Sequence, residues 1–209
     1  MNRLPSFLRQ HVAALRMLLV FTVLCGIIYP VFMWGVAQVA FKNQADGSLI
    51  TVNGKVVGSS LLCQEFVDAK GNPLPQWFQP RPSNATSGAA NDYGCDPGYS
   101  AASNLGPNSS KLTTTVDQRK EQVATFNHVP ESAVPPDAVT ASGSGLDPDI
   151  SPQYADIQVA RVAGARHLPV ATVQTLVNKY TQGRNIGFLG EPRVDVLDLN
   201  VALSELPGQ

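Results

Sequence analysis

The strongest hydrophobic pattern in the chain is an unbroken apolar run near its beginning. Residues 17–40 are 24 consecutive residues without a charged side chain. A helix of that length extends roughly 36 Å at about 1.5 Å per residue, and the hydrocarbon core of a bilayer is about 30 Å thick. The pattern therefore predicts one transmembrane helix over residues 17–40, preceded by a short segment, 1–16, and followed by a single domain, 41–209.

Four residues of this run are candidates for packing against another transmembrane helix: Gly26, Tyr29, Pro30 and Gly35. The glycines leave flat positions that a second helix can approach closely, and Tyr29 can donate a hydrogen bond to a neighbour. Pro30 removes one intrahelical hydrogen bond, which predicts a kink near the middle of the run. A plain anchor that faces lipid on all sides is the alternative interpretation.

The charges around the run predict its orientation. Arg3, Arg9 and Arg16 precede it, and the first acidic residue is Asp46. The positive-inside rule then keeps the N-terminus in the cytoplasm and exports residues 41–209. A cleaved signal peptide is the competing interpretation, but the run is longer than the usual apolar region of about 7–15 residues in such peptides. This length favours an uncleaved anchor.

Beyond the run, short β-branched stretches and turn residues follow. Residues 48–57 predict a β-hairpin, because Asn53 and Gly54 supply the two positive-φ positions of a tight turn between β-branched flanks. Residues 59–66 predict a short helix or a further strand. Residues 73–107 are rich in Pro, Gly, Ser, Asn and Ala, and their aromatic side chains favour a functional surface loop over a disordered segment.

Helical patterns dominate the rest of the chain. The spacing of apolar side chains and the capping serines predict helices over residues 110–127, 152–166 and 169–180, then a strand at 193–197 and a closing helix at 198–206. The candidate core positions are Val116, Val123, Phe126, Val173, Leu176 and Val177. Together these elements predict the α+β class, with one mixed α/β domain of three or four strands after the single N-terminal transmembrane helix.

Charge and cysteine content narrow the class of protein. Residues 41–209 hold 12 Lys and Arg against 16 Asp and Glu, and this net negative charge argues against a nucleic-acid partner. Cys63 and Cys95 both lie in the predicted exported domain, where an oxidising compartment favours a disulfide; two separate thiols are the alternative. No pair of Cys or His residues has the spacing of a metal site.

The sharpest candidate for chemistry is the Gly/Ser-rich segment 139–153, which leads into a predicted helix start. Backbone N–H groups and hydroxyls in such a loop can hold an anion or a phosphate, but no Gly-Lys-Ser/Thr follows, so it is not a P-loop. A turn in which Asp147 and Ser151 satisfy backbone groups is the alternative. Asp147 and Asp149 are weak candidates for an acid–base pair or a calcium site, and no Gly-x-Ser-x-Gly elbow of a hydrolase occurs.

The order of short motifs along the chain resembles the KdpC family, the small accessory subunits of bacterial Kdp potassium-transporting P-type ATPases. The resemblance runs nearly from end to end. Its most specific part is Val139-Thr140-Ala141-Ser142, Ser144-Gly145-Leu146-Asp147 and Ile150-Ser151-Pro152-Gln153, and it also includes Tyr29-Pro30, Gly47-Ser48-Leu49-Ile50, Gln64-Glu65-Phe66, Arg81-Pro82-Ser83, Ser103-Asn104-Leu105 and Leu199-Asn200.

The resemblance implies a subunit without catalytic residues of its own, in the bacterial cell inner membrane, with a periplasmic C-terminal domain. Its implied partners are a potassium-channel-like subunit and a P-type ATPase subunit. Its implied role is to stabilise assembly and, as a catalytic chaperone, to raise the ATP affinity of the pump subunit. No tightly bound cofactor is implied. ATP is instead shared in a ternary complex, for which Ser142, Ser144, Gly145 and Gln153 are the candidate nucleotide contacts.

The charge pattern opposes direct nucleotide contact, because it exports residues 142–153 to a compartment where ATP is scarce. Our preferred hypothesis is that the anchor packs on the channel-like subunit and the outer domain covers its potassium entrance. A function of another class competes with it: a stand-alone, membrane-anchored periplasmic enzyme or ligand sensor. That protein would be a stable monomer with its own ligand.

Overall fold

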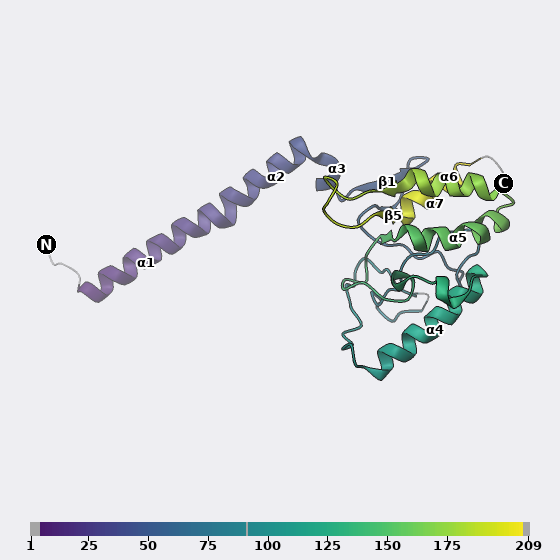
Figure 1. Cartoon of the computed structure of the whole chain (residues 1–209). Coiled ribbons are helices and arrows are strands. Elements are labelled where there is room, and N and C mark those ends of the chain that lie inside the picture. The colour runs from purple at the N-terminus through teal and green to yellow at the C-terminus, as the bar shows by residue number, and fades with distance from the viewer. Residues whose placement is uncertain (1–4, 91, 207–209) are drawn as a thin grey trace. The chain divides into compact units, whose positions relative to one another are not determined.

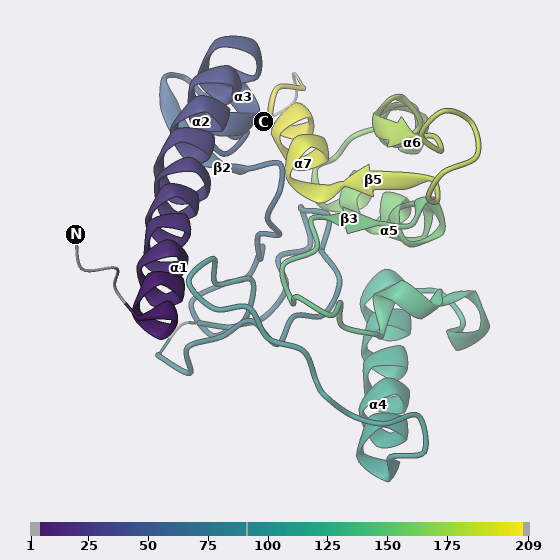
Figure 2. The same cartoon turned by 90° about the vertical axis from the view of Figure 1, so that its left-hand side faces the viewer.

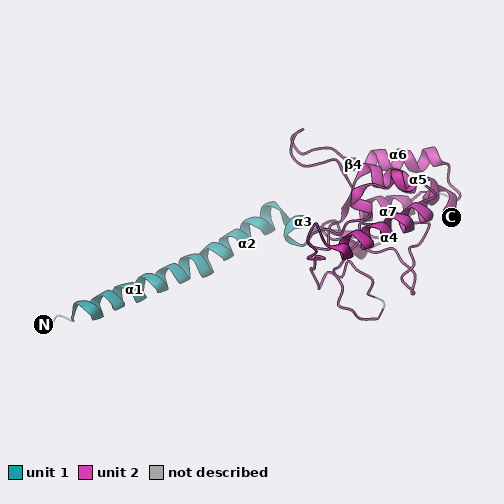
Figure 3. Cartoon of the chain, turned by 60° about the horizontal axis from the view of Figure 1, so that its bottom comes forward, with its two compact units in different colours: residues 1–48 teal, residues 49–209 magenta. Residues whose placement is uncertain are grey.

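The computed structural model describes residues 5–90 and 92–206. The chain divides into two compact units, residues 1–48 and residues 49–209 (Figure 3). The division falls after Ser48 rather than after Ala40, because the short helix α3 (Lys42–Ala45) continues the local helical contacts of the first unit. Each unit is described by itself.

Unit 1 is helical from Ser6 to Ala40, 35 residues that are long and apolar enough to cross a membrane. It comprises α1 (Ser6–Val23), a π-helical turn, η1 (Leu24–Ile28), and α2 (Tyr29–Ala40) (Figure 1). The helix thus begins well before Met17, where the uncharged run starts. A π-helical turn ends directly before Tyr29-Pro30, where the helix holds a residue that cannot donate a hydrogen bond, and the kink expected at Pro30 stays a prediction.

The residues predicted to pack against another helix lie on this segment without a partner from the described part of the chain. A Cβ atom added at Gly26 or Gly35 would meet nothing within 4 Å. Tyr29 is 61% exposed. Their contact with a second transmembrane helix stays a prediction.

Unit 2 begins with the predicted hairpin, which is confirmed. β1 (Leu49–Val52) pairs antiparallel with β2 (Lys55–Ser59), and the turn residues Asn53 and Gly54 have φ values of 51° and 77°. The helix or strand expected over residues 59–66 is wrong. This stretch is a turn followed by irregular backbone, and Ser59 Oγ accepts the Leu61 N–H at 3.1 Å. A side-chain acceptor at the end of β2 thus competes with a continued strand.

Among its described residues, the rest of unit 2 has four α-helices and a small sheet as its regular elements (Figures 1 and 2). The helices are α4 (Ser110–Asn127), α5 (Pro152–Ala165), α6 (Val170–Tyr180) and α7 (Val196–Ser204), with 3-10 turns at Glu131–Ala133 and Pro136–Ala138. The antiparallel sheet has the order β3 (Asp149–Ile150), β5 (Arg193–Asp195), β4 (Thr181–Gln182). The described residues therefore hold five short strands, where the sequence predicts three or four.

The helix starts follow their capping residues. Ser151 Oγ accepts the Tyr154 N–H at 3.0 Å at the start of α5, which confirms the predicted cap. The strand expected over residues 193–197 is too long, because Asp195 Oδ1 accepts the Asp198 N–H at 2.8 Å and starts α7 at Val196. On α4, Ser109 occupies the cap position without a side-chain hydrogen bond.

The hydrophobic core lies between α5, α6, α7 and β5. Val173, Leu176 and Val177 of α6 are buried there, as predicted. Val116 and Val123 of α4 are only partly buried against this core. Phe126 instead lies under the guanidinium of Arg161, 4.3 Å from its ring centre, so α4 contributes a half-buried face.

The long segment 73–107 contains no helix or strand among its described residues, yet its beginning runs through the core. Phe78 is fully buried. Its N–H donates to Asn200 Oδ1, and its carbonyl accepts from Asn200 Nδ2, both at 2.9 Å. The next residue repeats the pattern: the Gln79 N–H donates to Gln158 Oε1 at 2.7 Å, and Gln158 Nε2 donates to the Gln79 carbonyl at 3.2 Å. Two side-chain amides thus replace a neighbouring strand.

Two buried arginines satisfy the carbonyls just before Phe78. Arg161 donates to the carbonyls of Pro75 and Trp77 at 2.5 and 3.0 Å, and also to Gln158 and Asn127. Burial lowers the pKa of Arg161 to about 10, so it remains a cation at neutral pH. Arg166 donates to the Gln76 carbonyl at 2.7 Å and stacks on the Trp77 ring, 4.2 Å from its centre.

Asn200→Ala tests this arrangement. It leaves the N–H and carbonyl of Phe78 buried without partners, and we expect the free energy of unfolding to fall by about 2–4 kcal/mol. The matched control is Asn178→Ala on the exposed face of α6, which we expect to change it by about 0.5 kcal/mol or less. Urea unfolding of the full chain in detergent, followed by tryptophan fluorescence, measures both. Equal losses in the two variants would contradict the role of Asn200.

Candidate functional site: a disulfide-braced glycine/serine turn

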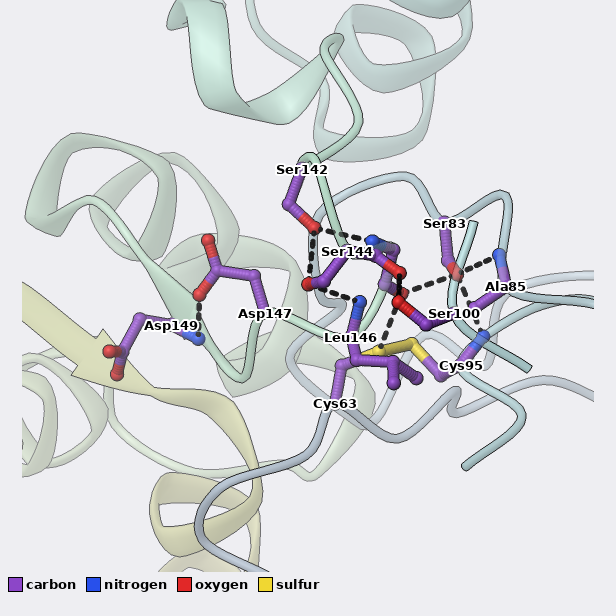
Figure 4. The surroundings of a disulfide bond; sticks show 11 residues. Cys63, Ser83, Ala85, Cys95, Ser100, Ser142, Ser144, Leu146, Asp147 and Asp149 are labelled. Carbon is purple, nitrogen blue, oxygen red and sulfur yellow. Dashed lines mark hydrogen bonds between the residues drawn. A yellow bond between two sulfur atoms is a disulfide. The ribbon is translucent and has the colours of Figure 1, made fainter. Parts of the chain in front are cut away.

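The Gly/Ser-rich segment forms a closed turn between the second 3-10 turn and β3 (Figure 4). Ser142 Oγ accepts the Gly145 N–H at 2.9 Å, and Ser144 Oγ accepts the Leu146 N–H at 3.1 Å. The two hydroxyl oxygens lie 3.4 Å apart. Both serine side chains therefore accept hydrogen bonds from backbone N–H groups of their own turn, as the side chains of Asx and ST turns do.

Gly145 occupies a position in the turn that only glycine fits. Its φ of 72° lies in the left-handed region, and a Cβ atom there would come 2.6 Å from the Ala101 carbonyl oxygen and 2.9 Å from Ala85. Its own carbonyl accepts from Ser83 Oγ at 2.6 Å. The turn is thus pressed against residues of the long segment, with no space for a side chain.

A disulfide joins Cys63 and Cys95 directly beside the turn (Figure 4). The two Cα atoms are 5.4 Å apart, and the residues are 32 positions apart in the sequence. The Cys63 N–H donates to the Leu146 carbonyl at 3.0 Å, and the Cys95 N–H donates to Ser83 Oγ at 2.9 Å. The bridge therefore ties the loop of Cys63, which bonds the turn directly, to the loop of Cys95, which reaches the turn through Ser83.

The aspartates that follow the turn are paired with arginines. Asp147 accepts from Arg81 Nη1 at 2.6 Å, and Asp149 lies 3.2 Å from Arg193 Nε. Burial raises the pKa of Asp149, and Arg193 opposes that rise. Asp147 Oδ1 also accepts the Asp149 N–H at 3.1 Å. This geometry favours the structural interpretation over an acid–base pair.

The candidate nucleotide contacts are divided between two elements. Ser142, Ser144 and Gly145 lie together in the turn, whereas Gln153 lies exposed in the first turn of α5, after β3. Gly145 is buried, and its N–H is bonded within the turn. Direct contact of these four residues with nucleotide stays a prediction.

No sequence pattern indicated one further feature, a cavity of about 510 Å³ beside the disulfide. Its wall includes Cys63, Cys95, Glu65, Asp92 and Asp96. Burial and the nearby Asp92 raise the pKa of Glu65 to about 7. The described residues contain no group of three or more His, Cys, Asp or Glu that could hold a metal ion. Glu65 is half-buried and lies in the stretch for which we expected a regular element, so the sequence pattern did not indicate that its side chain lines a cavity.

These features define a class of protein: one long apolar helix that fits a membrane, joined to a disulfide-braced α+β unit. Comparison with known proteins narrows the class. The family model described as "KdpC: K+-transporting ATPase, c chain" matches residues 11–205. The chain therefore belongs to the KdpC family, and the resemblance noted from its motifs is confirmed, as is the α+β fold class.

Relatives cover nearly the whole chain. A "Potassium-transporting ATPase KdpC subunit" of Streptomyces avermitilis is 49% identical, over 98% of this chain and 97% of its own length. Proteins with the same name are 48% identical in Kineococcus radiotolerans, over 96% of this chain and 95% of the relative, and 45% identical in Mycobacterium tuberculosis, over 95% and 99%.

Gly145→Ala tests the packing of the turn. The left-handed backbone and the contact with Ala101 both oppose a methyl group, so we expect a loss of about 2–4 kcal/mol in the free energy of unfolding. Gly143→Ala is the matched control two residues away, because its Cβ would meet nothing within 4 Å. Urea unfolding and limited proteolysis of the turn measure both. A control as destabilised and as easily cleaved as Gly145→Ala would contradict this account.

Glu65→Gln tests the half-buried carboxyl of Glu65. The ordinary glutamate pKa is about 4.3, so the folded state, with a pKa of about 7 at Glu65, binds more protons between these values. The free energy of unfolding must then fall as pH rises from about 4 to about 7 and level off above. The variant should show a shallower fall than the wild type, whereas Glu121→Gln on the exposed face of α4 should not.

The carboxyl of Asp195 keeps part of this pH dependence in every variant. Burial also raises the pKa of Asp195 to about 7, so a residual fall remains when Glu65 is replaced. Urea unfolding at a series of pH values from 4 to 8 measures the three slopes. If the slope of Glu65→Gln equals that of the wild type, Glu65 is not the group that titrates.

Proposed function

We propose that this chain is the non-catalytic accessory subunit of an ATP-driven, high-affinity potassium uptake complex. The observation that carries the proposal is the family match over residues 11–205, together with relatives named as KdpC subunits that align over 95–99% of their own length. In this proposal its partners are a potassium-channel-like subunit and a P-type ATPase subunit. The chain stabilises their assembly.

The apolar helix supplies the membrane anchor in this proposal. Its length and composition suit a span of the bacterial cell inner membrane. The arginines before the uncharged run favour a cytoplasmic N-terminus and a periplasmic unit 2. The disulfide of Cys63 and Cys95 supports the same orientation, because such bridges persist in oxidising compartments.

The proposed contribution to transport is a change in the pump cycle through contact. Unit 2 covers the potassium entrance of the channel-like subunit, and it binds one state of the complex more tightly than another. A subunit with such a preference shifts the equilibrium between states and in this way raises the ATP affinity of the pump subunit, as a catalytic chaperone does. Acidic side chains of unit 2 also attract cations to the entrance, within the limits of salt screening.

The geometry of the Gly/Ser turn supports contact rather than a phosphate grip as the origin of the ATP effect. Ser142 and Ser144 both accept hydrogen bonds from backbone N–H groups of the turn. The N–H groups of Gly145 and Leu146, which a phosphate would need as donors, are therefore already bonded within the closed turn. Direct nucleotide binding by Ser142, Ser144, Gly145 and Gln153 is the alternative route to the same effect.

The experiment is a mild-detergent purification of the tagged chain from its native membrane, with mass identification of the proteins that accompany it. We expect the channel-like and P-type subunits. Potassium affinity and ATPase rate are then compared for complexes that contain the full chain or only residues 1–48. We expect a lower potassium affinity, ATPase rate or ATP affinity without unit 2.

Two outcomes would contradict the proposal. A lone chain in several detergents would favour the stand-alone enzyme or sensor. Unchanged potassium affinity, ATPase rate and ATP affinity without unit 2 would show that the anchor alone carries the function. A Ser142→Ala, Ser144→Ala double variant separates the two routes to ATP affinity, because only direct binding predicts that ATP affinity is lost while the complex remains assembled.

A further inference from the structure

The loop between β4 and β5, residues 183–192, exposes an apolar surface that the fold of unit 2 does not use. All ten residues are exposed. Ile186, Phe188 and Leu189 have 83%, 68% and 49% of their surface accessible. We call these three side chains the apolar loop tip. A group of large apolar side chains on one exposed loop commonly marks an interaction site.

The apolar loop tip is held in one conformation by its own backbone. Asn185 and Leu189 exchange two hydrogen bonds, from the Asn185 N–H to the Leu189 carbonyl at 2.8 Å and from the Leu189 N–H to the Asn185 carbonyl at 2.9 Å. The Gly187 N–H donates to the Arg184 carbonyl at 3.2 Å. Ile186 has a φ of 55°, a conformation that a β-branched residue rarely adopts. The loop is thus built to present these side chains.

The charges of the loop are neutralised locally. Arg184 Nη2 lies 2.8 Å from Glu191 Oε2, at the base of the loop. The apolar tip is therefore not accompanied by the unpaired basic side chains that attract a protein loop to anionic lipids. A fixed shape with no net charge suits an apolar pocket on a protein, where preorganisation lowers the cost of binding.

The position of the loop within unit 2 fits a partner near the membrane. Figure 1 shows the loop projecting from the end of unit 2 at which β1 begins. Only eight residues, 41–48, connect the apolar helix to β1, and a chain of that length reaches at most about 30 Å. A surface at this end is thus within reach of subunits that surround the anchor.

We infer that the apolar loop tip docks into an apolar pocket on the periplasmic surface of the potassium-channel-like subunit. This inference rests on the proposed function and names the contact by which unit 2 is held on the complex. Burial of Phe188 at the centre, with Ile186 and Leu189 beside it, gives the few large apolar contacts that dominate the affinity of a protein interface.

The experiment places a photoreactive side chain at the tip. The substitution Phe188→p-benzoylphenylalanine is made in the tagged full-length chain, which is expressed with its complex and irradiated in native membranes. The adduct is identified by mass after denaturing purification. The matched control is Val170→p-benzoylphenylalanine at the start of α6, a site that is 54% exposed. We expect an adduct of position 188 with the channel-like subunit and none at position 170.

A second measurement tests the energy of the contact without chemical cross-linking. We expect Phe188→Ser to reduce the amount of channel-like subunit that accompanies the chain in detergent by about tenfold, and Val170→Ser to leave it unchanged. Because the side chains of Phe188 and Val170 are both exposed, the free energy of unfolding of the chain should not fall in either variant.

The outcomes separate this inference from the proposed function. An adduct with lipid or with another subunit, or no adduct, while the channel-like and P-type subunits still accompany the chain, overturns the docking of the loop and leaves the accessory-subunit role intact. A chain that is recovered alone before any substitution overturns the proposed function, and the docking inference falls with it.

Discussion

Four buried side chains substitute for secondary structure in unit 2, and the rest of the fold depends on them. The segment around Phe78 crosses the core as irregular backbone, whose N–H and carbonyl groups would be costly to bury unpaired. Asn200 and Gln158 each bond one residue through both amide atoms. Arg161 and Arg166 donate hydrogen bonds to the carbonyls of residues 75–77, directly before Phe78. This network links α5 and α7 to the long segment, and the long segment in turn carries the Gly/Ser turn's neighbours, Arg81 and Ser83.

Local signals in the sequence predict the elements that local chemistry determines. Asn53-Gly54 specifies its hairpin turn, Ser151-Pro152 starts α5, and the apolar spacing of residues 173–177 places α6 in the core. The predicted bounds of β5 and α7 are off by a few residues, because the cap at Asp195 outweighs the β-branched pattern around Val194. Residues only a few positions away determine where these turns and helix starts lie.

Features that depend on contacts distant in the chain could not be predicted in this way. Gln158 and Asn200 resemble ordinary polar residues of a helix, and nothing near them indicates that they bond backbone about 79 and 122 positions away. The residues next to Glu65 in the sequence likewise do not indicate that its side chain is half-buried. The site was therefore predicted as a segment, and the motifs identified the family, but the role of Ser142 and Ser144 in closing the turn required the structure.

The disulfide has a consequence for how the protein matures. Cys63 and Cys95 are the two cysteines of unit 2, and the third, Cys25, lies in the apolar helix. With one pair of cysteines in unit 2, a single intramolecular connectivity is available, so oxidation cannot produce a scrambled isomer within that unit. In the orientation that we propose, maturation then calls for an oxidant after translocation but no disulfide isomerase, and the formation of the bridge is timed by export.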